Sequence, residues 1–431
     1  MKLSNKPLKV LTGHHTALSI FAISAAFITY CSMYAFRKPF LASTYAEMSL
    51  WGIDYKIILI STQVLGYMLS KFIGIRVISE MQPERRLITV AILIGVAWVS
   101  LLLFGLTPFP YNFIWLFMNG LPLGLIWGLV FSFLEGRRNT ELLGAGMSAS
   151  FIVASGLVKS VGKYLLDHWH VSDFWMPFLT GLLFVPFLLL GIWMLSKIPP
   201  PDALDKMQRT ERVPMKKVQR WAFFREFSTG IVFLVIIYIA LTIFRDIRDS
   251  FAVEIWSLLG YSDSARILFT AEIYIAVAVF ALVALMIFIK NNRKAFFGNI
   301  GIIMLGGFLL MATTFLFQKG MLPPAIWMIM VGFAMYLSYI SYHTMLFERW
   351  IALFRYQSNI GFLMYIADAF GYLGSVGILF YKNFGTKSVN WLDYIVYISY
   401  IVGAVTIVLS IFAWRYFHGK EKRLTATRVT G

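Results

Sequence analysis

The chain is a succession of apolar runs, each about 20 residues or longer, separated by short polar segments. A helix of that length crosses the hydrocarbon core of a bilayer, which is about 30 Å thick. A barrel strand would instead alternate apolar and polar residues over about ten positions. The pattern therefore predicts an all-α membrane protein with twelve transmembrane helices, at residues 15–42, 55–78, 87–107, 111–134, 142–166, 173–196, 228–252, 266–290, 295–318, 323–346, 357–382 and 391–416.

Composition and charge agree with this interpretation. Of the 431 residues, 59% are hydrophobic and only 14% are charged, whereas a soluble domain of this size needs a far more polar surface. The net charge of +17 could indicate a nucleic-acid partner, but most Lys and Arg residues fall in loops and tails on one side of the predicted spans. This asymmetry is the positive-inside signal, and it predicts that both termini are cytoplasmic. We therefore expect the lipid bilayer, and no nucleic acid, as a partner.

Two further features concern processing and compartment. The single cysteine, Cys31, excludes an internal disulfide. No small-residue cleavage site follows the first apolar run, so we interpret that run as a mature helix rather than a signal peptide. Together with the absence of a targeting segment, this favours a bacterial inner membrane.

A basic linker divides the chain into two halves. Pro199, Pro200 and Pro201 end the sixth apolar run, and the segment 197–226, counted with Lys197 itself, contains eight Lys and Arg residues. We predict an N-terminal six-helix bundle at residues 1–196, a cytoplasmic linker at 197–226 and a C-terminal six-helix bundle at 227–431.

The second half repeats features of the first. Tyr30 and Arg37 recur 208 positions later as Tyr238 and Arg245. Later in each half, Gly144 and Met147 recur 217 positions on as Gly361 and Met364. Two six-helix repeats in the same orientation are the arrangement of the major facilitator fold, which places its site between the repeats.

Arg37 and Arg245 are the leading candidates for a binding site. An arginine at the bilayer centre costs roughly 2.5 to over 10 kcal/mol, so such a residue is retained where it meets an anion. The guanidinium fork matches phosphate or carboxylate oxygens. The alternative is a structural charge paired with an internal acid, which Asp246 and Asp249 make possible for Arg245. Arg37 has no acidic residue nearby in the sequence.

Other polar residues in the spans form two groups. Candidates for contact with a bound anion are Lys71, Lys38, Tyr30, Tyr34 and Tyr238. Candidates for internal ion pairs or for proton coupling are Asp246, Arg248, Asp249, Glu272, Asp368 and His343. For each of them a structural role remains open, because lysines extend to the interface, tyrosines pack in cores, and a histidine at a helix end forms local hydrogen bonds. Cations outnumber acids within the spans, which favours a divalent anion over a cation or a neutral sugar.

Signatures of enzymes are absent. The sequence has no phosphate-binding GxxxxGK[ST] loop, no HExxH helix and no GxSxG elbow. We therefore expect no catalytic residues, no metal site and no cofactor. Without a nucleotide-binding domain, transport would have to be driven by a gradient or by exchange.

Three stretches carry a resemblance to a known family. They are Tyr30 and Tyr34 followed by Arg37 to Phe40 (RKPF), Gly66 to Ile73 (GYMLSKFI), and Asn119-Gly120 with Gly124 and Trp127. With these the sequence resembles the organophosphate:inorganic phosphate antiporter family of the major facilitator superfamily, which includes glycerol-3-phosphate and hexose-6-phosphate transporters. The resemblance implies that Arg37 and Arg245 hold a phosphate and that Lys71 assists. It places the chain in an outlying branch, because the family's histidine in the fifth helix is missing between Gly144 and Phe151.

The sequence thus predicts a secondary active transporter of a small anionic, phosphorylated metabolite. It would work by alternating access, as a monomer, with phosphate exchange or proton coupling. Two alternatives remain open: a membrane receptor that senses such an anion without transporting it, and a lipid flippase.

Overall fold

The computed structural model describes residues 15–135, 137, 140–200, 202, 205, 217–261, 265–354, 360–385 and 390–429. In the first half the elements are α1 (His15–Ala35), η2 (Pro39–Ala42), β1 (Ser49–Leu50), β2 (Ile53–Asp54), α2 (Tyr55–Glu80), η3 (Pro83–Arg85), α3 (Arg86–Leu106), α4 (Phe113–Leu123), α5 (Ile126–Phe131), α6 (Thr140–Trp169) and α7 (Met176–Ser196). β1 and β2 form a short antiparallel hairpin.

The second half contains helices almost throughout its described part. They are α9 (Lys217–Ser250), α10 (Ala252–Leu258), α11 (Ala265–Ile287), α12 (Asn292–Gln318), α13 (Pro324–Ser341), the π-helical segment η4 (Tyr342–Leu346), α14 (Phe347–Phe354), α15 (Ile360–Gly385) and α16 (Trp391–Val429).

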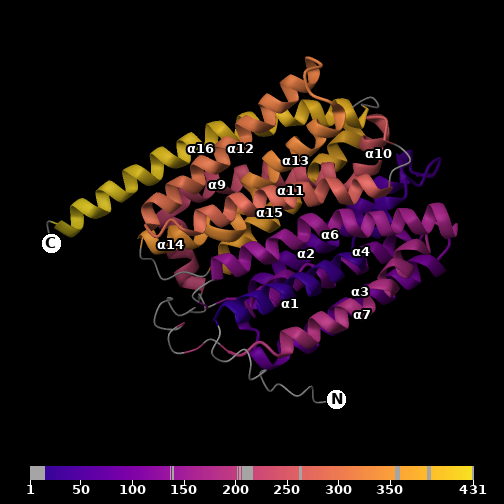
Figure 1. Ribbon diagram of the computed structural model, residues 1–431, viewed down its shortest axis with the longest axis horizontal. Helices are drawn as coiled ribbons and strands as arrows, with labels where there is room; N and C mark the ends of the chain where they lie inside the picture. Colours follow the sequence, from indigo (N-terminus) through magenta and orange to yellow (C-terminus); the bar gives the residue numbers. More distant parts are fainter. Residues whose placement is uncertain are drawn as a thin grey trace.

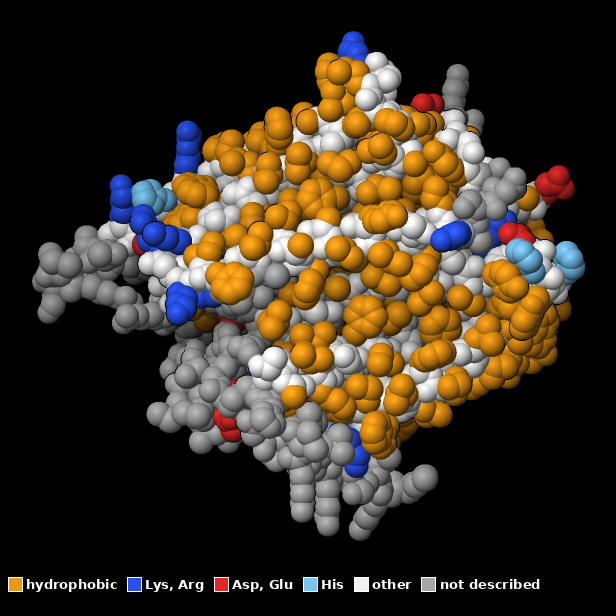
Figure 2. Space-filling model, viewed as in Figure 1, with side chains coloured by type: hydrophobic (Ala, Val, Ile, Leu, Met, Phe, Trp, Pro, Cys, Tyr) orange, Lys and Arg blue, Asp and Glu red, His pale blue; other side chains and the backbone are white. Residues whose placement is uncertain are grey.

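Within these ranges, twelve helical segments are long and apolar enough to cross a membrane, and each corresponds to one of the twelve predicted spans. This confirms the predicted all-α membrane fold. Apolar side chains cover most of the middle of the face in Figure 2, whereas Lys and Arg side chains gather toward its two ends. Such a surface is stable where lipid, rather than water, surrounds the helices.

The helices run roughly parallel to one another, and the two halves lie side by side (Figure 1). The halves meet where α2 packs against α15 and where α6 packs against α11. We call the end where α2 ends and α9 begins the linker side, and the end where α1 ends and α2 begins the far side. Residues 201, 203–204 and 206–216 of the predicted linker at 197–226 lie outside the described residues, so the domain boundaries stay a prediction. α9 already begins at Lys217, and its backbone is non-helical at Phe227.

The prediction of one continuous first span at 15–42 is wrong in one respect. α1 ends at Ala35, and the chain makes a turn before η2. The amide groups of Arg37 and Lys38 both donate to the Tyr34 carbonyl oxygen, at 3.0 and 2.9 Å. Pro39 explains the break, because in a continued helix its ring would clash with the carbonyl group of Ala35, four positions earlier, and it has no N–H to donate to that carbonyl. Arg37 therefore lies in an unwound segment rather than within a helix.

Close helix packing in the first half depends on a glycine. A Cβ atom at Gly120 of α4 would lie 2.2 Å from the carbonyl oxygen of Gln63 in α2. We expect Gly120→Ala to destabilise the protein by about 1–3 kcal/mol, because a backbone oxygen cannot rotate away and the two helices must separate. Gly95→Ala in α3 is the matched control, since nothing lies within 4 Å of its added Cβ. Thermal unfolding in detergent measures both variants, and equal Tm values would contradict this role of Gly120.

Candidate functional site

Arg37 lies in the turn after α1, and its side chain is buried. Only 3% of the residue is exposed. Its guanidinium carbon lies 3.6 Å from the centroid of the Tyr67 ring and 6.0 Å from that of Tyr34. Its Nε atom is buried without a hydrogen-bond partner, and within the described part of the chain no carboxylate pairs with it. Contact with an aromatic face stabilises a cation only partly, so this side chain keeps unused hydrogen-bonding capacity.

Two amide side chains hold the turn that carries Arg37. The Gln63 side chain donates to the Arg37 carbonyl oxygen at 2.7 Å and to the Asn119 side-chain oxygen at 2.8 Å. Asn119 donates in turn to the Phe36 carbonyl at 2.8 Å. Unwound backbone persists at membrane depth only where protein groups satisfy it. Asn119 belongs to the stretches that carry the family resemblance, whereas Gln63 was not predicted as a site residue, although an amide inside an apolar run was the available signal.

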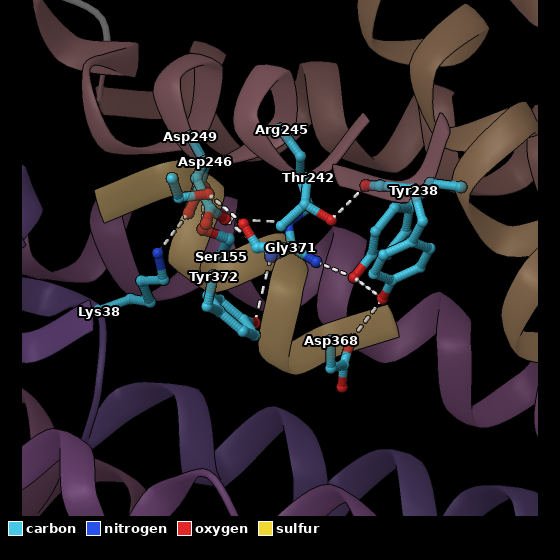
Figure 3. Close-up of polar contacts among 12 residues, drawn as sticks. Lys38, Ser155, Tyr238, Thr242, Arg245, Asp246, Asp249, Asp368, Gly371 and Tyr372 are labelled. Carbon is cyan, nitrogen blue, oxygen red and sulfur yellow. Dashed lines mark hydrogen bonds and ion pairs between the residues drawn. The ribbon is translucent and has the colours of Figure 1, made fainter. Parts of the chain in front are cut away.

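Arg245 enters the same region from α9 (Figure 3). Its Nη2 and Nε atoms lie 2.7 and 3.0 Å from Asp246 Oδ1, so the predicted structural ion pair is present. The guanidinium also donates to the hydroxyl groups of Tyr372, at 3.1 Å, and Tyr339. The Tyr372 ring connects the two arginines, since its centroid lies 5.8 Å from the Arg37 guanidinium carbon and 5.4 Å from that of Arg245.

Lys71 of α2 pairs with Asp368 of α15 across the two halves. Lys71 Nζ lies 2.8 Å from Asp368 Oδ2, and both side chains are buried. The Tyr238 hydroxyl donates to the other oxygen of Asp368 and lies 2.7 Å from the Tyr339 hydroxyl (Figure 3). Hydrogen bonds and ion pairs thus connect Lys71, by way of Asp368 and the two tyrosines, to the guanidinium of Arg245. Lys71 and Asp368 were predicted separately as candidates, and their pairing was not predicted.

On the far side, Asp249 of α9 binds two lysines of the first half. Its carboxylate lies 2.8 Å from Lys38 Nζ and 2.7 Å from Lys159 Nζ, and it accepts a hydrogen bond from Ser155 (Figure 3). Lys38 belongs to the turn after α1, and Lys159 belongs to α6. The candidate Lys38 is therefore committed to an ion pair in this conformation.

A further pair closes the far side beyond Asp249. Lys56 at the start of α2 lies 2.5 Å from Glu254 of α10 and donates to the Leu41 carbonyl at 3.1 Å. Neither charged residue was predicted as a candidate, because both lie at or beyond predicted span ends, where charges are common. Each described ion pair between the halves joins a lysine of the first half to a carboxylate of the second.

The candidates Arg248, Glu272, Tyr30 and Tyr34 do not belong to the described ion pairs that join the two halves. Arg248 pairs with Glu272 at 2.8 Å and donates to the Met328 carbonyl at 3.3 Å, so this pair lies entirely within the second half. Tyr30 and Tyr34 are buried near Arg37, and their ring centroids lie 5.6 Å apart.

His343 lies in the π-helical segment η4. Its Nε2 atom is 3.4 Å from the Tyr238 hydroxyl, and its Nδ1 atom is 3.3 Å from the Tyr339 carbonyl oxygen. Trp127 and Phe151 of the first half pack against its ring, with centroid separations of 5.7 and 5.5 Å. The histidine therefore connects the tyrosine pair with the contact between the halves.

Tyr365 closes the linker side next to this site. It belongs to α15 and packs into a slot beside two glycines of the first half. A Cβ atom added at Gly74 would lie 2.6 Å from the ring of Tyr365. A Cβ atom added at Gly128 would lie 2.3 Å from the hydroxyl oxygen of Tyr365. The halves therefore touch on both sides of the arginine pair, which leaves Arg37 and Arg245 enclosed.

Two positive charges of the cluster lack a carboxylate of their own among the described residues. Arg37 has none, and Lys38 and Lys159 share the single carboxylate of Asp249. Arg245, Lys71, Lys56 and Arg248 each have one acidic partner. The enclosed site thus carries a surplus of about two positive charges, which in a low-dielectric interior favours a divalent anion.

Comparison with solved structures identifies similar folds. The crystal structure of a D-xylose–proton symporter has a TM-score of 0.58 at 15% identity, covering 93% of this chain and 98% of that chain. The human organic anion transporter MFSD10 (TETRAN) has a TM-score of 0.57 at 12% identity, covering 92% and 98%. The nucleoside transporter NupG has a TM-score of 0.58 at 13% identity, covering 93% and 99%. At such identities the likeness shows the fold alone, and that fold is the predicted one of the major facilitator transporters.

Comparison of the sequence gives the family. Among curated proteins none matches the chain. A family model matches residues 39–420. The matched segment does not include the site residues Tyr30, Tyr34, Arg37 and Lys38. Because this match covers most of the chain, the chain belongs to the family of unknown function DUF5690.

Proposed function

We propose that this protein is a secondary active transporter of a small divalent anion, in particular a phosphorylated metabolite. One observation carries the proposal: the buried guanidinium of Arg37 has no acidic partner among the described residues and lies within 6 Å of the same ring, that of Tyr372, as the guanidinium of Arg245. A buried unpaired cation is costly. A bound dianion would remove that cost and would use the free donors of the guanidinium.

The site residues have distinct roles in this proposal. Arg37 and Arg245 hold the anion from opposite halves, and Lys71 assists once it leaves Asp368. Tyr30, Tyr34 and Tyr238 orient the substrate, and Lys38 attracts it from the far side. The similar solved structures are those of a sugar symporter, an organic anion transporter and a nucleoside transporter, so the substrate class rests on the charges of this site and on the resemblance to organophosphate antiporters.

The transport cycle would alternate between two sets of contacts. We propose that bundles 1–196 and 227–431 rock about the central site, joined by the cytoplasmic linker. Breaking the Lys71–Asp368 pair and withdrawing Tyr365 would open the linker side. Breaking the lysine pairs of Asp249 and of Glu254 would open the far side. The bound anion would weaken these pairs by competing for their lysines. The orientation of both termini toward the cytoplasm of a bacterial cell belongs to the same proposal.

The test is exchange of inorganic phosphate in proteoliposomes. We expect purified full-length protein to exchange internal radiolabelled phosphate for external unlabelled phosphate, with saturation. Glycerol and sugar phosphates are expected to compete, whereas neutral sugars are not. If folded protein binds phosphate without exchanging it, the receptor alternative is correct. If it neither binds nor exchanges phosphate, a phosphate-bearing substrate is excluded.

A further inference from the structure

We propose that His343, Tyr238 and Asp368 form a proton relay, and that Asp368 takes up one proton for each anion that binds. The inference rests on the proposed function, because it assigns the coupling ion to the same site. The three side chains form a continuous path: Asp368 accepts from the Tyr238 hydroxyl, and that hydroxyl lies 3.4 Å from His343 Nε2. Buried acid and histidine chains of this kind are typical of proton pathways in transporters.

The surroundings of Asp368 decide when it can take a proton. α2 contributes Lys71, in contact at 2.8 Å, and Tyr67, whose ring centroid lies 5.2 Å from Lys71 Nζ. α9 contributes Tyr238, and α13 and η4 contribute Tyr339 and His343 behind it. Lys71 is thus the only cationic side chain described in direct contact with the carboxylate. Whatever removes Lys71 from Asp368 removes its counter-charge.

The substrate is what would remove it. A dianion held by Arg37 and Arg245 also attracts Lys71, and a carboxylate left beside a second anion is disfavoured in its charged form. A proton from water on the linker side then passes through the relay. Protonated His343 donates from Nε2 to the Tyr238 oxygen, and the hydroxyl proton of Tyr238 moves to Asp368. One proton enters and one carboxylate is neutralised, with no change in oxidation state.

The hydrogen-bond directions fit this transfer. A tyrosine hydroxyl has one proton, and that of Tyr238 is engaged by Asp368. Toward His343 the Tyr238 oxygen can therefore act as an acceptor. Nδ1 of His343 faces another acceptor, the Tyr339 carbonyl oxygen. Both ring nitrogens thus face acceptors, which is the environment that a doubly protonated imidazole requires.

The position of His343 ties the relay to the conformation of the halves. π-helical segments such as η4 occur frequently at functional sites, because the extra residue redirects a side chain. Trp127 and Phe151 of the first half cover the His343 ring. Separation of the halves on the linker side would uncover His343 to water, and their closure would seal the proton inside.

The experiment compares two activities of the full-length protein in proteoliposomes. The first is phosphate exchange at equal pH on both sides, and the second is phosphate accumulation driven by a pH gradient. Because phosphate itself carries protons, the quantity compared between variants is the ratio of accumulation to exchange under the same gradient. We expect Asp368→Asn to retain measurable exchange but to lower this ratio at least about tenfold.

Two further variants separate the relay from general damage to the site. Asp246→Asn removes another buried carboxylate of the cluster, and we expect it to lower exchange and accumulation in proportion, so that the ratio is kept. Tyr238→Phe interrupts the relay without changing any charge, and we expect it to slow gradient-driven uptake more than exchange.

The outcomes distinguish this inference from the proposed function. A wild-type ratio for Asp368→Asn, or wild-type exchange without any response to the pH gradient, overturns the relay and leaves the transporter in place. A lack of exchange by folded wild-type protein overturns the transporter and the relay together. A selective fall of the ratio in Asp368→Asn and of gradient-driven uptake in Tyr238→Phe supports the relay.

Discussion

Arg37→Lys is expected to reduce phosphate exchange about 100-fold, since charge-assisted hydrogen bonds of a guanidinium fork contribute roughly 1.5–3 kcal/mol each. Lysine keeps the positive charge but offers a point cation in place of the planar fork, so it cannot bind two oxygens of one anion in the same way. It also loses the stacked contact with the Tyr67 ring, where the arginine lies 3.6 Å from the centroid. Initial rates of exchange in proteoliposomes measure this effect.

The control for Arg37→Lys is the same chemical change at a site without a proposed role. Arg415 is exposed on α16, and Arg415→Lys is expected to leave exchange unaltered. Because Arg37 makes no ion pair among the described residues, we also expect Arg37→Lys to retain the wild-type elution profile and Tm. Wild-type exchange rates in Arg37→Lys would show that this guanidinium does not hold the substrate.

Asp249→Asn is expected to be the most destabilising single change in the far-side contacts. It leaves Lys38 and Lys159 facing one another without a counter-charge in a buried site. Removing one partner of a buried ion pair typically costs about 3–5 kcal/mol. We therefore expect a clear fall in Tm in detergent and a shift toward a conformation that is open on the far side.

A double variant tests the cause of that instability. Adding Lys159→Met to Asp249→Asn removes one of the two uncompensated charges, and we expect it to recover part of the lost Tm. Lys159→Met alone leaves Asp249 paired with Lys38, so its effect should be smaller than that of Asp249→Asn. If the double variant is less stable than Asp249→Asn, packing rather than charge holds the far side together.

Local sequence patterns were sufficient for the membrane architecture. Each span requires a run of apolar residues whose length is set by the bilayer, and such runs are visible without any knowledge of their neighbours. The twelve predicted spans all appear, although their ends moved and the fourth is divided between α4 and α5. The first span shows why the predicted ends moved. Pro39 explains a break after Ala35, but the path of the chain from there to Ala42 depends on its contacts with other helices.

The candidate residues were also partly visible in the sequence. An ionisable group within an apolar run is conspicuous, so Arg37, Arg245, Lys71 and Asp368 could be named from their positions alone. The depth of Arg245, Lys71 and Asp368 follows from the rise of a helix. The partner of each charge does not follow, because pairing depends on which helices face one another across the two halves.

Only the tertiary structure decided those partners. The packing of α2 against α15 places Lys71 on Asp368, and the turn after α1 brings Lys38 to Asp249, which Lys159 of α6 also reaches. The same packing leaves Arg37 without an acid among the described residues, while Arg245 has Asp246 beside it. The sequence by itself determined how many helices cross the membrane and which charges they carry, because both are properties of local segments. Which charges are neutralised and which remain for a ligand was decided by contacts between segments far apart in the chain, and no local pattern records them.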